Sequence, residues 1–232
     1  MKNELMRVYD RLFTRYGDLG WWPAVSPYEV MIGAVLTQNT AWENVQKAIA
    51  RFGDRLAPEA VLAMETAELT DIIRPAGSYM RKAACIQAVT RWFGHYGFSV
   101  PAAARQPPAK TRGELLRIGG VGKETADAIL LYALDYPVFM VDAYTCRLAE
   151  RYPLPAGAGY DAVQAYFTRN LPNDGALYKH LHALIVTNAK TYCRKKPVCG
   201  ECPLSGGCLR VIRIPLHSDY SPHGQGRLSD KC

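Results

Sequence analysis

The sequence predicts an all-α protein, and three observations support that prediction. Near the start of the chain, apolar residues recur at helical spacing and form one stripe: Leu5, Val8, Tyr9, Leu12, Phe13 and Tyr16. Helix-start signals, with prolines at first helical positions, recur further along the chain. No segment shows a convincing alternation of apolar and polar residues, which is the pattern that a half-buried strand requires.

Capping signals divide the chain into successive helices. Ser26-Pro27-Tyr28-Glu29 offers an N-cap, a proline at the first helical position and a capping-box glutamate, and Thr40-Ala41-Trp42-Glu43 repeats the capping pattern. Thr111-Arg112-Gly113-Glu114 is expected to cap a helix that restarts at Lys123 after a glycine-rich turn, and Asp142 is expected to cap a helix ending near Arg151. Further helices are expected at 58–64, 67–73, 80–96, 161–170 and 175–190, an extended connector at 101–108, and a frayed tail at 218–232.

Size and composition are those of a soluble globular protein. The 232 residues suffice for one large domain or two modest ones, and 49% are hydrophobic while 21% are charged. No run of about 18 apolar residues and no signal-peptide core is present, so we expect a cytoplasmic protein. The formal net charge is +7, which favours a polyanionic partner.

Four of the seven cysteines fall in the pattern Cys193-x5-Cys199-x2-Cys202-x5-Cys208. In a reducing compartment such a cluster indicates a metal centre more than disulfides. A single zinc ion in a four-cysteine site usually uses two separated Cys-x2-Cys pairs, and only one such pair is present. The pattern therefore favours an iron–sulfur cluster, with zinc as the alternative.

A glycine-rich turn, Gly119-Gly120-Val121-Gly122, separates two expected helices and precedes Lys123. Because glycines leave no side chains in the way, backbone N–H groups at the start of the second helix can face a phosphate. Such a hairpin would bind DNA without reading its sequence. The alternative is an ordinary connector between helices.

The chain resembles the endonuclease III, or helix-hairpin-helix (HhH-GPD), superfamily of DNA glycosylases. The resemblance lies in motifs that follow one another in that family's order: Gly120-Val121-Gly122, Thr125-Ala126-Asp127, Val141-Asp142 and the four cysteines. The resemblance extends from about residue 27 to residue 208, and the spacing before Cys199 is one residue shorter than in well-known members. It implies two helical lobes flanking a DNA-binding cleft. Residues 21–133 would form a six-helix barrel with the hairpin; residues 1–20 and 134–217 would hold a [4Fe–4S] cluster; residues 218–232 would be a flexible tail.

The resemblance also implies the partner and the catalytic group. The partner would be double-stranded DNA with a damaged base or abasic site, and the protein would be a nucleoid-associated monomer of bacterial or archaeal type. Asp142 would be the catalytic carboxylate, which stabilises positive charge on the deoxyribose and orients or deprotonates water. The alternative is that Asp142 only caps its helix.

One position departs from the lyase-competent members, which have a lysine two residues after the last hairpin glycine. Glu124 occupies that position, and Lys123, one residue earlier, should point about 100° away and contact phosphate or solvent. A carboxylate forms no Schiff base, so we expect a monofunctional glycosylase. The alternatives are a bifunctional glycosylase and AP lyase acting on oxidised pyrimidines, which would recruit Lys123 or another amine, and a non-catalytic iron–sulfur DNA-binding module.

Other residues resemble the bacterial 3-methyladenine DNA glycosylases of this superfamily, among them Trp21-Trp22-Pro23 and the run 35–40. Alkylated purines are cationic, so an aromatic pocket could hold one by stacking and cation–π attraction. The candidates for this pocket are Trp21, Trp22, Trp42 and Tyr144, although packing alone would also explain the tryptophans. Gln38 matches a position that fills the gap left by a flipped base. Two further residues, His180 and His182, are expected to be core or interface histidines.

Overall fold

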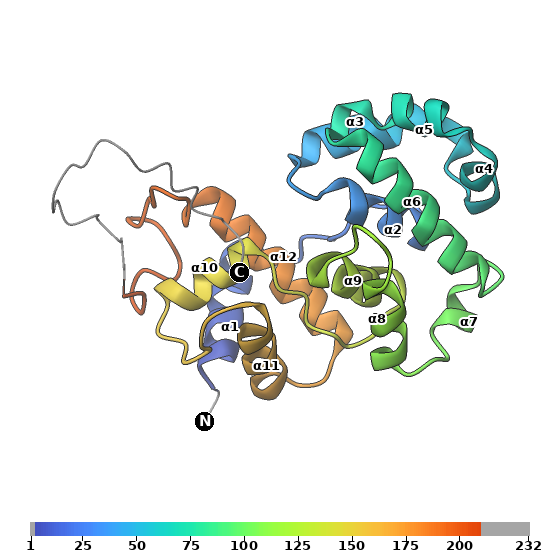
Figure 1. Ribbon diagram of the computed structural model, residues 1–232. Helices are drawn as coiled ribbons and strands as arrows, with labels where there is room; N and C mark the ends of the chain where they lie inside the picture. The colour runs from blue at the N-terminus through green and yellow to red at the C-terminus, as the bar shows by residue number, and fades with distance from the viewer. Residues whose placement is uncertain (1–2, 210–232) are drawn as a thin grey trace, which may run out of the picture. The chain divides into compact units, whose positions relative to one another are not determined.

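The computed structural model describes residues 3–209, and within this range every regular element is a helix. This confirms the all-α prediction (Figure 1). Short 3-10 turns follow α3 and α5, and a π-helical segment at Ile129–Ala133 extends α9. The α-helices are α1 (Glu4–Tyr16), α2 (Pro27–Leu36), α3 (Trp42–Phe52), α4 (Pro58–Ala63), α5 (Thr66–Ile72), α6 (Tyr79–Gly94), α7 (Val100–Ala103), α8 (Pro108–Leu116), α9 (Lys123–Ala128), α10 (Ala143–Arg151), α11 (Tyr160–Asn170) and α12 (Gly175–Thr191).

The chain forms two compact units. The central unit comprises residues 20–140 and 174–179, and it contains α2 to α9 and the first turn of α12. Within the described residues, the terminal unit comprises residues 3–19, 141–173 and 180–209, and it contains α1, α10, α11 and the rest of α12.

Helix α2 lies at the core of the central unit because it is apolar on nearly every side. Eight of its ten residues are buried, which is typical of a helix enclosed by neighbours. It contacts α3, α6, α9 and the π-helical segment. The predicted cap is confirmed, since the Ser26 hydroxyl accepts a hydrogen bond from the Glu29 N–H at 3.1 Å and Pro27 is the first helical residue.

Helix α1 packs in the terminal unit through the predicted apolar stripe. Leu5, Val8 and Leu12 are fully buried, whereas Phe13, at the edge of the stripe, is 41% exposed. Polar contacts join α1 to α12: the Tyr16 hydroxyl donates to Asn188 Oδ1 at 3.1 Å. A 13-residue helix is marginal alone, so its stability comes from this packing.

Three predicted elements were wrong in detail. Helix α3 is capped by Ala41 and not by Thr40, because the Thr40 hydroxyl is engaged by Lys82 and by the carbonyl of Ala76. The expected connector at 101–108 contains the short helix α7, capped by the hydroxyl of Ser99. The helix that Thr111 was expected to cap is capped by Pro107 instead and begins at Pro108.

Residues 3–209 include no helix with the length and apolar character needed to span a membrane. The predicted tail at 218–232 lies outside the described residues.

Candidate functional site

Asp142 caps helix α10 in the terminal unit, as the sequence predicted. Its Oδ1 accepts a hydrogen bond from the Thr145 N–H at 2.7 Å and another from the Thr145 hydroxyl at 2.9 Å. The aspartate is buried, with 9% of its surface exposed, and its backbone is extended, as expected of an N-cap. The helix ends at Arg151, again as predicted.

His182, on α12, is a second partner of this carboxylate. Its Nε2 lies 3.3 Å from Oδ2 of Asp142, and its side chain is 3% exposed. His182 was predicted to be a core or interface histidine, and its burial confirms a core position, but its partner was not predicted. The two residues are 40 positions apart, so no local pattern could have joined them.

The partners of Asp142 favour its ionised form. Burial alone raises the pKa of a carboxyl group, but the hydrogen bond and electrostatic attraction from His182, with the two bonds from Thr145, outweigh it. The pKa of Asp142 therefore lies below its ordinary value of 3.8, and the group is an anion at neutral pH.

The glycine-rich turn in the central unit joins α8 to α9 as a helix-hairpin-helix. Gly120 has a φ of +92°, and Gly122 caps α9 with an extended backbone. Lys123 and Glu124 are both exposed in the first turn of α9. A Cβ on Gly120 would lie 3.3 Å from the Cβ and Sγ of Cys85, so both backbone conformation and space favour glycine there.

Gln38 binds this hairpin in the structure. Its Nε2 donates to the carbonyl of Gly120 and to the hydroxyl of Thr125, both at 2.9 Å. The segment after α2, which carries Gln38, is thus joined to the turn before α9. The sequence could not reveal this contact, because 82 residues separate Gln38 from Gly120.

A buried lysine holds the segment that carries Gln38. Lys82 is 1% exposed, and its Nζ donates to the Leu36 carbonyl at 2.8 Å, the Thr40 hydroxyl at 2.6 Å and the Ala76 carbonyl at 2.7 Å. Burial lowers the pKa of this amine to about 8. The three acceptors lie on both sides of Gln38 and before α6, so one ammonium fixes both segments.

An ion pair joins the two helices of the hairpin. The Arg112 guanidinium on α8 donates from Nε to Asp127 Oδ1 at 2.6 Å and from Nη2 to Oδ2 at 3.0 Å. The Asp127 side chain is fully buried, whereas that of Arg112 is 25% exposed. This bidentate geometry restrains α8 relative to α9.

Three aromatic side chains gather in the central unit. Trp22 and Trp42 pack edge to face with their ring centroids 5.5 Å apart, and Tyr132 lies 5.2 Å from Trp22. Trp21, Trp22 and Trp42 are all half-buried. The structure therefore brings together two of the predicted pocket residues and adds Tyr132, which the sequence analysis missed because it lies 90 residues beyond Trp42.

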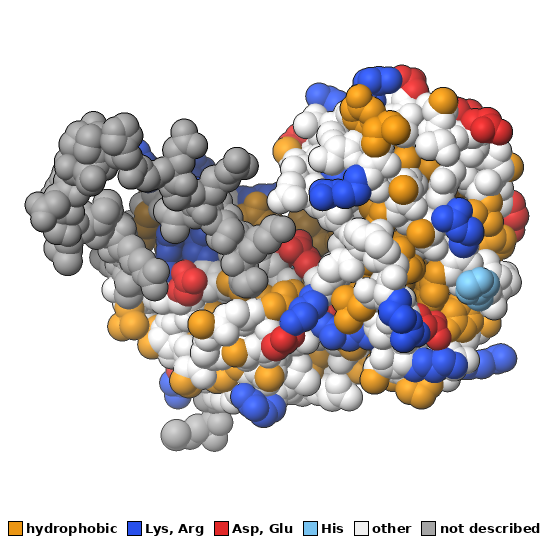
Figure 2. Space-filling view, viewed as in Figure 1, with side chains coloured by type: hydrophobic (Ala, Val, Ile, Leu, Met, Phe, Trp, Pro, Cys, Tyr) orange, Lys and Arg blue, Asp and Glu red, His pale blue; other side chains and the backbone are white. Residues whose placement is uncertain are grey.

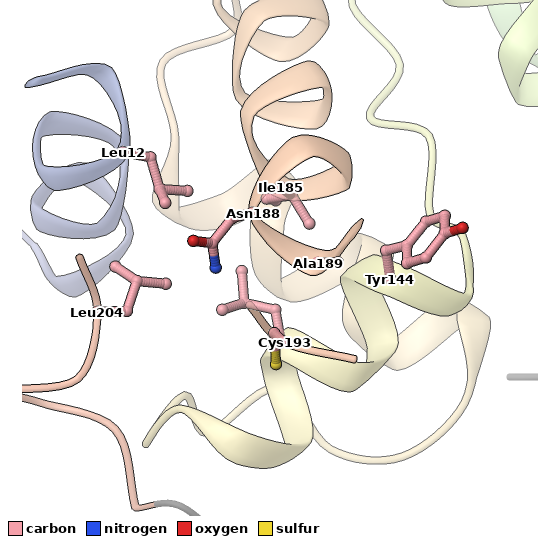
Figure 3. Close-up of a pocket in the computed structure, with 8 residues that line it drawn as sticks. Leu12, Tyr144, Ile185, Asn188, Ala189, Cys193 and Leu204 are labelled. Atoms are coloured by element: carbon pink, nitrogen blue, oxygen red, sulfur yellow. The ribbon is translucent and has the colours of Figure 1, made fainter. Parts of the chain in front are cut away.

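Tyr144, the fourth predicted pocket residue, belongs to the terminal unit. Its ring is half-buried, and the Arg147 guanidinium lies over it, 5.5 Å from the centroid. It lines a small cavity (Figure 3) together with Leu12, Leu148, Ile185, Asn188, Ala189, Cys193 and Leu204. This cavity borders the segment that carries the four cysteines.

Arg151, the last residue of α10, contacts both ends of the cysteine segment. Its Nη1 lies 3.4 Å from Cys193 Sγ and donates to the Arg194 carbonyl at 2.7 Å, while its own carbonyl accepts from Cys208 Sγ at 3.1 Å. Cys202 lies 3.8 Å from the Asn188 amide. Burial raises the pKa of the Cys202 thiol, and the neighbouring thiols of Cys193 and Cys199 add to that effect.

These four thiols have the donor chemistry of an iron–sulfur site and lie on one short segment against the ends of α10 and α12. Within residues 3–209, no three side chains of His, Cys, Asp or Glu are arranged so that they could hold a metal ion. The cluster predicted from the cysteine spacing stays a prediction.

On the face of the central unit seen in Figure 2, Lys and Arg side chains lie among acidic and apolar ones. The net charge of +7 gives a general attraction to a polyanion, and backbone N–H groups such as those of the hairpin are candidates for positioning contacts.

Comparison with known proteins identifies the family of this chain. The chain matches the HhH-GPD superfamily of base excision DNA repair proteins over residues 32–173. It is 44% identical to a putative DNA repair glycosylase of Methanocaldococcus jannaschii, over 88% of this chain and 96% of that protein. It is 28% identical to an endonuclease III of Thermotoga maritima, over 78% and 82% of the two chains.

A solved structure agrees with these relatives. The 3-methyladenine DNA glycosylase of H. pylori, bound to 1,N6-ethenoadenine, matches with a TM-score of 0.70 and 26% identity, over 81% of this chain and 98% of that chain. The chain belongs to the HhH-GPD superfamily of base excision DNA repair proteins. The resemblance identified from the sequence motifs is thereby confirmed.

Proposed function

We propose that this protein is a DNA glycosylase that flips a damaged base out of double-stranded DNA and hydrolyses its N-glycosidic bond, with Asp142 as the catalytic carboxylate. The observation that carries the proposal is the environment of Asp142: a buried aspartate at a helix N-terminus, hydrogen-bonded at both oxygens by partners that lower its pKa. The membership of a base excision repair family and the relatives named as glycosylases support it.

The chemistry requires a fixed negative charge. As the bond between C1′ and the base nitrogen breaks, its electron pair leaves with the base and positive charge develops on the deoxyribose. A carboxylate that is already an anion stabilises this charge without reorganising. The oxygen of a water molecule then bonds to C1′, and Asp142 or bulk water accepts its proton.

Water is the proposed nucleophile because of the residues at the start of α9. Glu124 occupies the position where lyase-competent members have a lysine, and a carboxylate cannot form a Schiff base. The second candidate function is that of a bifunctional glycosylase and AP lyase. The exposed amine of Lys123 in the first turn of α9, and the relative named endonuclease III, favour it.

Contacts with DNA are proposed for the hairpin and for Gln38. The backbone N–H groups around Gly120 and Gly122 and the amine of Lys123 would bind phosphate. In the structure the Gln38 amide binds Gly120 and Thr125. Entry of Gln38 into the gap left by a flipped base would exchange these two bonds for bonds to the orphaned base.

The proposed substrate is an alkylated purine. The half-buried tryptophans, with Trp22 and Trp42 packed against each other, supply aromatic surface that could stack on such a base. Tyr144, in the terminal unit, is proposed as a further aromatic contact to the damaged base. The structural neighbour from H. pylori was solved with 1,N6-ethenoadenine, a purine with an added two-carbon bridge.

The proposed ligands of a [4Fe–4S] cluster are the thiols of Cys193, Cys199, Cys202 and Cys208. The cluster would brace the segment that carries the cysteines, and the chemistry of base release would not pass through it. Iron analysis and absorption near ~400 nm test this assignment; a colourless protein with one bound zinc would contradict it.

The test of function is base release from methylated duplex DNA, run beside borohydride trapping on abasic-site DNA. We expect released methylated purine, no trapped adduct, and loss of release in Asp142→Asn with abasic-site binding retained. Efficient trapping that Lys123→Ala abolishes would establish the bifunctional alternative. Full base release by Asp142→Asn would refute the role of Asp142, and the absence of any base release would favour a non-catalytic DNA-binding module.

A further inference from the structure

The Asp142 carboxylate has more partners than a helix cap needs. Capping α10 requires one bond from the helix backbone to one side-chain oxygen, and the Thr145 N–H already provides it at 2.7 Å. The Thr145 hydroxyl supplies a second bond to the same oxygen at 2.9 Å. The other oxygen, Oδ2, contacts His182 from a different helix.

The direction of the contact between Asp142 and His182 follows from the charge of the carboxylate. An ionised carboxylate can only accept hydrogen bonds, so the hydrogen of this bond is on Nε2 of His182. Both side chains are buried, with 3% of the His182 side chain and 11% of the Asp142 side chain exposed, so little water competes for either group. The bond therefore restrains the rotation of the carboxylate, since each oxygen is held from a different side.

His182 itself lies in a buried part of the terminal unit. Its neighbours on α12, from Leu181 to Val186, are all buried. Further along α12, Asn188 is bonded to Tyr16 of α1. The position of the His182 ring is thus determined by the core of the unit, which is the property that a positioning group requires.

We propose that His182 is a positioning residue for base release: its Nε2–H holds the Asp142 carboxylate in one orientation. This inference rests on the proposed catalytic role of Asp142. His182 touches neither substrate nor water in this account; it acts through Asp142. The competing explanation is that Asp142 only satisfies a buried histidine, in which case the catalytic rate does not depend on the bond.

The experiment compares four variants of the full-length protein in single-turnover release of methylated purines from duplex DNA across a range of pH. His182→Leu removes the donor, and His182→Gln places an amide N–H at a similar reach. His180→Leu is the matched control, because His180 lies on the same helix and instead contacts the Tyr9 hydroxyl at 3.1 Å and the Asp18 carboxylate at 3.2 Å. Asp142→Asn tests the proposed function itself.

We expect His182→Leu to release base roughly 10- to 100-fold more slowly, which is the effect of losing one hydrogen bond to a charged group. The acid limb, which is the fall in the rate of base release at low pH, should move to higher pH in this variant. The reason is that the Asp142 carboxylate loses a partner that lowers the pKa of Asp142. Affinity for abasic-site DNA should stay unchanged, His182→Gln should recover part of the rate, and His180→Leu should behave as wild type.

The outcomes separate the two proposals. If Asp142→Asn keeps the wild-type rate, the proposed function fails. If Asp142→Asn is inactive while His182→Leu keeps both the wild-type rate and the wild-type acid limb, only the positioning role of His182 is overturned. If His182→Leu does not fold, the acid limb of His182→Gln decides. A neutral amide should hold the anion less strongly than the imidazole does. The inference is therefore overturned if His182→Gln has its acid limb at the wild-type pH and a rate equal to that of His180→Leu.

Discussion

Replacing Arg112 by methionine should destabilise the protein more than the loss of any exposed ion pair. The change removes the guanidinium that gives Asp127 two hydrogen bonds, at 2.6 and 3.0 Å, while the fully buried carboxylate stays in place. A buried charge that loses its partner is costly because water cannot replace the lost bonds. Methionine retains most of the apolar stem, so the change tests charge more than packing.

The magnitude follows from the number of bonds and from their exposure. Two charge-assisted bonds at about 1.5–3 kcal/mol each give an upper range of about 3–6 kcal/mol. Because the Arg112 side chain is 25% exposed, solvent weakens the pair, and we expect a loss of about 3 kcal/mol in the free energy of unfolding. The double variant Arg112→Met/Asp127→Leu should recover part of this loss, because it also removes the buried charge.

Urea unfolding measures the effect through the midpoint at an unchanged slope. The control is Arg51→Met, which breaks a 2.7 Å pair with Asp71 between side chains that are 43% and 57% exposed. That variant should lose less than about 0.5 kcal/mol. A loss below about 1 kcal/mol for Arg112→Met, or one equal to that of Arg51→Met, would refute the reasoning that burial determines the strength of this pair.

Three further predictions concern Lys82, Gly120 and Asp142. Lys82→Met should cost about 2–3 kcal/mol in urea unfolding, because three buried acceptors lose their donor at once; a loss below about 1 kcal/mol would contradict this. Gly120→Ala should cost about 1–2 kcal/mol and lower the melting temperature, because φ of Gly120 is +92° and the new Cβ would lie 3.3 Å from Cys85. The control is Gly119→Ala, whose new Cβ would meet nothing within 4 Å, and its melting temperature should clearly exceed that of Gly120→Ala. The pKa of Asp142 is lowered, so its contribution to stability is present above its ordinary value of 3.8 and is lost as pH falls through the folded pKa below that value. The difference in unfolding free energy between wild type and Asp142→Asn should therefore shrink below pH 3.8, and a constant difference would show that the carboxylate has no such shift.

The sequence by itself determined the features that depend on neighbouring residues. The stripe of α1, the Ser26 cap of α2 and the Asp142 cap of α10 were predicted correctly, because helix periodicity and capping act within a few residues. The family followed from motifs that keep their order and spacing along the chain. The roles of Asp142 and of the cysteines in the reaction and in metal binding stay predictions.

Only the tertiary structure decided which distant groups meet. The Thr40 cap failed because Lys82, from another helix, occupies its hydroxyl. His182 reaches Asp142, and Gln38 reaches Gly120, across 40 and 82 residues. A helical pattern specifies which side of a helix is buried, but the partner on that side depends on how several helices pack together, and this information is not present in any local segment of the chain.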